Sequence, residues 1–390
     1  MLPAAKALQP ELVALRRAIH RYPELAFNEH RTAALVAHTL NEIGLETQTG
    51  VGRTGVVAYL GDGPGPVVAI RADMDALPIE EINTTEYASE APGRMHACGH
   101  DAHTAMLLGV ARLLAGQQLP GQVRLLFQPA EEAADEFGVS GAPRMLEDGA
   151  LEGVDYVLAL HVAPSLATGT ISCLPGQASG AVDTFRAHVK GVGGHGAHPD
   201  QTVDAIWLTA QVLNALYAVP SRRIDPLRPA VLSLGVVRGG TASNVIPAMV
   251  YLEGTLRSLD ATVREQLIEE VQRSLEIART LGGDYTLDIE RGYPSMVNNA
   301  DVAATIANAA EDLLGSAAVV EAHGTMGAED FAYMSALKPG AMFSLGVRAP
   351  GAPIRPVHTP DFDLDEDALP IGAAVLAETA LRLLQQGTAA

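Results

Sequence analysis

The sequence predicts an α/β fold with a central sheet covered by helices and a smaller domain inserted into the chain. In both outer parts of the chain, near-continuous apolar strand segments alternate with helical ones, which is typical of a sheet buried on both faces. The middle follows the ferredoxin-like order strand–helix–strand–strand–helix–strand. We therefore expect one domain built from 1–179 and 293–390 and an inserted domain over 180–292.

The first part of the chain begins with two helices. Leucine and isoleucine recur at helical spacing over 8–22 and predict a helix there. A second helix is expected over 28–43, because Gly44 readily adopts the left-handed conformation that ends a helix. The other elements expected before residue 180 are strands at 54–60, 67–72, 122–127 and 156–162 and a helix at 101–115.

The remaining elements follow from the same periodicities. The inserted domain is expected to hold strands at 184–192, 230–238, 245–257 and 284–291 and helices at 202–218 and 261–281. After it, we expect helices at 300–314, 328–337 and 365–386 and strands at 316–321 and 341–347.

Composition excludes several kinds of partner. Lys and Arg number 26 against 46 Asp and Glu, a net charge of −20 that repels nucleic acid and anionic membranes. No apolar run is long enough for a membrane span, and charged residues interrupt the N-terminal segment before a signal-peptide core can form. The two cysteines, Cys98 and Cys173, form no disulfide framework, so we expect a cytoplasmic protein.

Metal-ligating residue types cluster in HACGHDAH at 96–103. Thiolate and imidazole together suit Zn²⁺ and similar ions. Cys98 and His100 are two apart and would point the same way in an extended segment, and His96 could join them. His103 would lie inside the following helix. The alternative is a surface turn that merely collects histidines.

Two glutamates follow the strand expected at 122–127. Functional groups are common at the carboxyl ends of strands in open α/β sheets. Adjacent residues in an extended segment project oppositely, so one of Glu131 and Glu132 could bind a metal ion while the other accepts a proton from water. A solvated acidic turn is the alternative.

Three further segments carry candidate groups. His161 ends the strand expected at 156–162 and is either a core residue or a metal ligand. Asp73 and Asp75 follow the strand at 67–72; Asp75 could orient a ligand histidine, and either aspartate could cap a helix or turn. His358 lies in a proline-rich loop and, taken alone, favours a plain surface position.

Together these segments resemble the peptidase M20 family, within it the amidohydrolase branch of hippurate hydrolases, N-acyl-amino-acid amidohydrolases and auxin-conjugate hydrolases. The resemblance covers nearly the whole chain in order. The motifs that carry it are RAIHRYPEL at 17–25, ADMDALP at 72–78, HACGHDAH at 96–103, QPAEE at 128–132, LHV at 160–162, GGHGAHP at 193–199, SNVIP at 243–247, GTLRS at 254–258, GAEDFAY at 327–333 and HTP at 358–360.

The resemblance implies a dinuclear catalytic domain and an inserted lid or dimerisation domain. The ligands that it implies are Cys98, His100, Glu132, His161 and His358. Glu131 matches the family's general base, Asp75 the aspartate behind a ligand histidine, and His195 the histidine that stabilises the oxyanion, often across the dimer. Asn244 and Arg257 match positions linked to binding the substrate carboxylate. His96 and His103 are expected to be structural or supporting, a ligand role for Asp73 is not expected, and His198 has no assigned role.

The resemblance implies a metal-dependent amidohydrolase that cleaves N-acyl or N-aroyl amino acids with a metal-bridging water and a glutamate base. The alternative is a metal-dependent carboxypeptidase or dipeptidase acting on short peptides. A non-catalytic metal-binding module would lack a ligand or the base, and neither is missing. We expect two divalent ions per chain, Zn²⁺, Mn²⁺, Co²⁺ or Ni²⁺, a small-molecule substrate, and a homodimer or higher homo-oligomer formed through the inserted domain.

Overall fold

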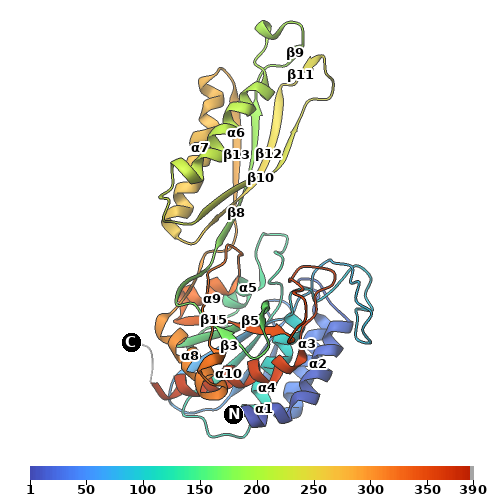
Figure 1. The fold of residues 1–390 in the computed structure, drawn as a ribbon, viewed down its shortest axis with the longest axis vertical. Coiled ribbons are helices and arrows are strands. Elements are labelled where there is room, and N and C mark those ends of the chain that lie inside the picture. The colour runs from blue at the N-terminus through green and yellow to red at the C-terminus, as the bar shows by residue number, and fades with distance from the viewer. Residues whose placement is uncertain (387–390) are drawn as a thin grey trace. The chain divides into compact units, whose positions relative to one another are not determined.

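The computed structural model describes residues 1–386 and divides into two compact units (Figure 1). The first unit comprises Met1–Gly176, Val297–His323 and the C-terminal part from Tyr333 onward. The second comprises Gln177–Met296 and Gly324–Ala332. The architecture is α/β with a large central sheet, which confirms the predicted fold class. That the second unit acts as a lid and dimerisation domain stays a prediction.

The first unit contains a seven-stranded sheet with the order β1-β2-β4-β3-β5-β15-β6. Strands β3, β4, β5 and β15 are parallel to their neighbours within this group, and β1, β2 and β6 pair antiparallel at the two sides. The strands are β1 (Glu46–Val51), β2 (Gly55–Leu60), β3 (Val67–Asp73), β4 (Gln122–Gln128), β5 (Tyr156–Ala167), β6 (Ile171–Ser172) and β15 (Gly340–Arg348). Strand β3 is buried almost throughout, as expected for a strand with both faces covered.

Helix α4 lies at the centre of this unit and positions the first metal-ligating segment. It contacts α2, α3, α10 and β3, and Arg112 is its only residue that is not buried. The helices of the outer parts of the chain are α1 (Leu2–Ala7), α2 (Gln9–Arg21), α3 (His30–Ile43), α4 (His100–Leu114), α5 (Gly141–Glu147), α8 (Ala300–Leu314), α9 (Phe331–Leu337) and α10 (Leu369–Gln386). Short 3₁₀ helices span Ser316–Ala318 and Glu366–Ala368.

The second unit has a four-stranded antiparallel sheet with the order β10-β12-β8-β13, and its helices α6 and α7 bury a separate apolar core. This order is ferredoxin-like. Asp204 and Asp260 cap the helices by accepting backbone N–H groups. The elements are β8 (Ala181–Lys190), β9 (Gly194–His195), α6 (Ala205–Arg222), β10 (Ala230–Gly239), β11 (Val245–Ile246), β12 (Met249–Ser258), α7 (Ala261–Thr280) and β13 (Asp284–Arg291), with a 3₁₀ helix at Pro199–Gln201. Strands β7 (Gly176–Ser179) and β14 (Met296–Asn298) lie at its borders.

Several predicted elements differ from the structure in their bounds or type, among them the helices expected at 202–218 and 365–386, which begin at Ala205 and Leu369, and the strand expected at 156–162, which extends to Ala167. The strand expected at 316–321 is a 3₁₀ turn followed by one isolated bridge from Val319 to Ile171, because the segment is only partly covered. The strand expected at 245–257 is two strands, since Pro247 has no N–H to donate to a ladder. The helix expected at 328–337 begins only at Phe331.

Over residues 1–386, no helix has both the length and the apolar character needed to cross a bilayer.

Candidate metal centre

The predicted ligands of the first unit lie on four separate segments. Cys98 and His100 belong to the loop before α4 and to its first residue, and Glu132 lies in the loop after β4. His161 lies within β5. His358 lies in the loop between β15 and α10, where its backbone N–H donates to the Ala97 carbonyl at 2.8 Å and holds this loop beside Cys98.

The side-chain atoms of these residues that could bind a metal ion, here called donor atoms, lie close together. The Cys98 Sγ lies 3.3 Å from the His161 Nε2, and the Glu132 Oε1 lies 3.1 Å from the His358 Nε2 and 3.9 Å from the His100 Nε2. Three overlapping groups each contain at least two of the predicted ligands and base, and within each group the potential metal-binding atoms lie within 4.8 Å of one another. The groups are Cys98–His100–His161, Cys98–Glu132–His358 and His100–Glu131–Glu132.

The chemistry of this donor set fits a divalent cation. The His100 ring donates through Nδ1 to Asp75, at 2.9 Å to its carbonyl and 3.1 Å to Oδ1, while its buried Nε2 makes no hydrogen bond within residues 1–386. Burial opposes charge on His100, but the carboxylates of Asp73, Asp75 and Glu132 raise its pKa to about 10. The site therefore concentrates negative charge around a donor atom that has no hydrogen-bond partner.

The Cys98 thiol also indicates a site for a cation. Burial raises its pKa well above the usual range, and the carboxylates of Glu132 and Glu131 raise it further. A thiolate is the form that binds metal, so Cys98 needs a neighbouring cation to lose its proton.

Hydrogen bonds fix the orientation of the neighbouring histidines. The His161 Nδ1 donates to the Val162 carbonyl at 2.8 Å, which leaves Nε2 directed at Cys98. The His103 Nδ1 donates to the Asp73 Oδ1 at 2.6 Å, and its Nε2 accepts the Val162 N–H at 3.0 Å. Burial, more than any neighbouring charge, lowers the pKa of His103 to about 4, so this ring is neutral and both nitrogens are used, as expected for a supporting residue.

Asp73 connects β3 to this network. Arg71 donates to the Asp73 Oδ2 at 2.6 Å and to the Gln128 Oε1 at 2.9 Å, which joins the carboxyl ends of β3 and β4. Burial opposes ionisation of Asp73, but Arg71 and two histidines hold its pKa well below the usual range. Asp73 is thus committed to Arg71 and His103.

The backbone between β4 and the two glutamates is not extended, contrary to expectation. Ala130 adopts a left-handed conformation with φ 47°, and oxygens of both Glu131 and Glu132 lie in one donor group with His100. The Glu132 N–H donates to the Asp75 Oδ2 at 3.0 Å. The expected opposite projection of the two side chains is therefore not observed, because the turn at Ala130 replaces the regular pleat.

Sequence reasoning missed Glu29. This carboxylate is fully buried; its Oε1 accepts the N–H groups of Ala130 and Phe27, each at 2.9 Å, and its Oε2 accepts the Thr54 hydroxyl at 2.5 Å. Burial raises the pKa of Glu29 to about 7. Glu29 and Ala130 are 101 residues apart, so no local motif could connect them.

A buried charge network supports the start of α4. Arg16 is fully buried and donates to the Asp101 Oδ2 at 2.7 Å, and the His20 Nδ1 lies 2.8 Å from the same oxygen. His96 packs beside His20 with ring centroids 6.3 Å apart, and burial lowers its pKa to about 3. His96 belongs to none of the donor groups found within residues 1–386, and its structural or supporting role stays a prediction.

The other predicted site residues lie in the second unit. His195 pairs with Val245 between β9 and β11, beside Asn244, whose carbonyl accepts the Gly196 N–H at 2.8 Å. Arg257 lies near the opposite end of β12, eight residues beyond Met249, or roughly 26 Å away at the rise of a β-strand. Within one chain, the structure does not bring Asn244 and Arg257 together.

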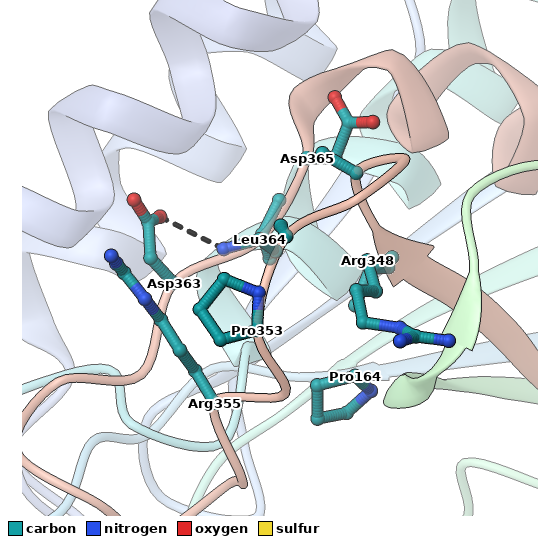
Figure 2. A pocket seen from close by; sticks show the side chains of 10 residues that line it. Pro164, Arg348, Pro353, Arg355, Asp363, Leu364 and Asp365 are labelled. Carbon is teal, nitrogen blue, oxygen red and sulfur yellow. Dashed lines mark hydrogen bonds between the residues drawn. The ribbon is translucent and has the colours of Figure 1, made fainter.

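A small cavity of about 160 Å³ lies beside the segment that leads from β15 to His358 (Figure 2). Arg348 and Arg355 line it together with Asp363 and Asp365. Both carboxylates have partners elsewhere: Asp363 accepts from Tyr87 at 2.9 Å and Asp365 from Thr168 at 2.8 Å. None of the predicted metal ligands lines this cavity.

The α/β fold and the partly buried cluster of thiol, imidazole and carboxylate groups are those of a metal-dependent hydrolase. The chain matches the family model described as peptidase family M20/M25/M40 over residues 69–382 and belongs to this family.

Relatives and a solved structure match over nearly the full length. Thermostable carboxypeptidase 1 of Saccharolobus solfataricus is 40% identical, covering 97% of this chain and 96% of the relative. The N-acetyl-L-cysteine deacetylase of Bacillus subtilis is 38% identical, covering 97% and 89%. The crystal structure of the Bacillus subtilis YxeP protein, described as a dinuclear metal-binding peptidase of the M20 family, aligns with a TM-score of 0.85 at 35% identity, covering 97% and 99%.

Proposed function

We propose that this protein hydrolyses the amide bond of N-acyl or N-aroyl amino acids with the help of two divalent metal ions. The observation that carries the proposal is the set of overlapping donor groups around the buried Nε2 of His100, with the Glu131 carboxylate in the same cluster. A relative at 38% identity that is named a deacetylase of an N-acetylated amino acid favours this substrate class.

Each predicted site residue of the first unit has a defined role in this proposal. Cys98 and the three histidines would hold the ions together with Glu132. The bound ions would activate water and polarise the amide carbonyl. Glu131 takes the proton of the attacking water and delivers it to the leaving nitrogen, and Asp75 keeps the His100 ring oriented through Nδ1. The mixed donor set suits Zn²⁺ or Co²⁺ and also accommodates Mn²⁺ or Ni²⁺.

The second unit contributes charge and hydrogen bonds to the substrate. In this proposal His195 shares the oxyanion charge, and Asn244 and Arg257 bind the free carboxylate. Arg257 lies roughly 26 Å along β12 from Met249, the end of the strand nearer to Asn244 in sequence, so in this proposal a single carboxylate that engages both Asn244 and Arg257 contacts two chains. This requirement agrees with the proposed homodimer. A cytoplasmic location stays a prediction.

The second candidate is a metal-dependent carboxypeptidase or dipeptidase. It uses the same water, base and ions, and it is favoured by the relative at 40% identity that is named a carboxypeptidase. The two candidates differ only in the group on the acyl side of the amide bond.

A substrate panel distinguishes the two candidates. Metal-reconstituted protein is assayed against N-acetyl and N-benzoyl amino acids and against dipeptides with the same C-terminal residue. We expect kcat/KM at least about tenfold higher for the N-acyl substrates, or ~1.4 kcal/mol of transition-state preference. The reverse ranking would establish the peptidase, and absence of turnover on both classes would overturn the proposed function.

A further inference from the structure

The loop that carries Glu131 and Glu132 is held in an unusual conformation. Ala130 is fully buried and left-handed, with φ 47°, a conformation that alanine rarely adopts. Its carbonyl accepts the Gly141 N–H at 2.8 Å, and a Cβ on Gly141 would lie only 1.6 Å from the Pro129 carbonyl oxygen. The direction in which the two glutamates leave the main chain therefore depends on contacts that hold Ala130.

The backbone N–H of Ala130 donates a hydrogen bond to the Glu29 carboxylate. The Glu29 Oε1 accepts the Ala130 N–H at 2.9 Å, and the same oxygen accepts the Phe27 N–H at 2.9 Å. The second oxygen, Oε2, is held by the Thr54 hydroxyl at 2.5 Å. A fully buried carboxylate with three hydrogen bonds has one orientation, so the acceptor for Ala130 is fixed in place.

We propose that Glu29 is a positioning residue of the hydrolytic site. By accepting the Ala130 N–H it fixes the left-handed turn, and through that turn it sets the positions of the Glu131 and Glu132 carboxylates. The inference rests on the proposed function, because that function assigns these two glutamates their roles.

The chain offers a matched control in Glu24. Its carboxylate accepts the N–H groups of Arg31 and Thr32, each at 2.9 Å, and the Thr32 hydroxyl at 3.0 Å. It thus supports the first turn of α3 with three hydrogen bonds, as many as Glu29 makes. None of these bonds reaches the loop 129–132, so Glu24→Ala tests the cost of losing a comparable structural carboxylate.

The test compares Glu29→Ala, Glu29→Gln and Glu24→Ala in the metal-loaded full chain. Hydrogen exchange of the backbone amides in 130–133, bound metal, kcat and KM are measured for each. We expect Glu29→Ala to speed exchange in this loop and to lower kcat on the order of 10–100-fold, with KM within about threefold. Glu29→Gln keeps an oxygen that can accept both N–H groups, so it should restore most of kcat and the slow exchange.

Glu24→Ala should speed exchange only at the start of α3 and leave kcat within about threefold of the wild type. Equal effects of Glu29→Ala and Glu24→Ala on kcat, or unchanged loop exchange in Glu29→Ala, would overturn the proposal. If Glu29→Ala does not fold, Glu29→Asp replaces it: the shorter side chain keeps the charge but withdraws the acceptor, so it should fall below Glu29→Gln in kcat. The reverse ranking would show that charge rather than position matters.

Loop exchange needs no substrate, so the inference and the proposed function fail separately. Wild-type protein that turns over no amide, combined with loosening of 130–133 in Glu29→Ala, would refute the function and retain the role of Glu29 in fixing the loop.

Discussion

Glu131 and Glu132 are adjacent in sequence and share a donor group with His100, so their tasks must be separated by experiment. Glu131→Gln keeps the shape of the side chain and removes the proton acceptor. We expect bound metal to stay near the wild-type level while kcat falls on the order of 10²–10⁴-fold. Glu132→Gln removes an anionic ligand and should lower metal affinity, so that its residual activity depends on added metal.

Bound metal and kcat at saturating substrate, measured for both variants, decide the assignment. Loss of metal in Glu131→Gln with retention of both ions in Glu132→Gln would exchange the two roles. Because the turn at Ala130 directs both carboxylates to one cluster, measuring only one of the two variants cannot separate them.

Glu29 should also leave a signature in the pH dependence of stability. Burial, with a further contribution from the Asp75 carboxylate, raises its pKa from 4.5 to about 7, although the Thr54 hydroxyl opposes the shift. Between pH 4.5 and 7 the folded protein holds a proton that the unfolded chain releases, so stability falls as the pH rises through this window. The contribution is about 3 kcal/mol at most.

Urea unfolding of wild type and Glu29→Gln at pH 5 and pH 8 measures this contribution, since other titrating groups cancel in the difference. The variant should gain stability relative to the wild type at the higher pH. An identical change in the free energy of unfolding between pH 5 and pH 8 for the two proteins would contradict a raised pKa of Glu29.

At the scale of elements, local pattern predicted the segments that carry the ligands. Strand β4 and helix α4 lie within a residue of their expected bounds, because their apolar periodicity is local and most of their residues are buried. The expected contact of Asp75 with a predicted ligand histidine is present, at 3.1 Å from His100. Contacts between distant segments could not be predicted, because the partner of Glu29 lies 101 residues away and nothing near Ala130 signals a left-handed turn.

The second unit exposes an edge strand and an apolar helix surface that bear on the oligomer prediction. Strand β10 ends one side of its sheet, and its Val237 is 51% exposed. On α6, Trp207 and Tyr217 are 49% and 56% exposed. Exposed edges and large apolar side chains of this kind favour a protein–protein contact, here with a second copy of the chain.

Val237→Lys should therefore shift the protein toward the monomer, because an edge lysine opposes strand pairing. Light scattering coupled to size-exclusion chromatography, over a range of concentrations, measures the shift. The matched control is Thr286→Lys on β13, the opposite edge strand. A wild type that stays monomeric throughout, or equal dissociation of both variants, would refute the prediction.

The overall negative charge of the protein and its cluster of metal-binding residue types have different consequences for substrate binding. The net charge of −20 opposes an anionic substrate, so local cations must supply the attraction that the overall field lacks. The donors for those cations come from four segments that only the folded first unit brings together. The residue types could be read from the sequence, whereas the distances among them, and the separation of Asn244 from Arg257, required the fold.

In the proposed function, hydrolysis depends on two divalent ions held by this cluster. The most direct measurement is elemental analysis of the purified protein paired with its amidase activity, before chelation, after chelation and after metal is returned. We predict about two divalent ions per chain, loss of activity in parallel with metal removal, and recovery on reconstitution. Full activity in protein that elemental analysis shows to be free of metal would contradict the proposed metal dependence.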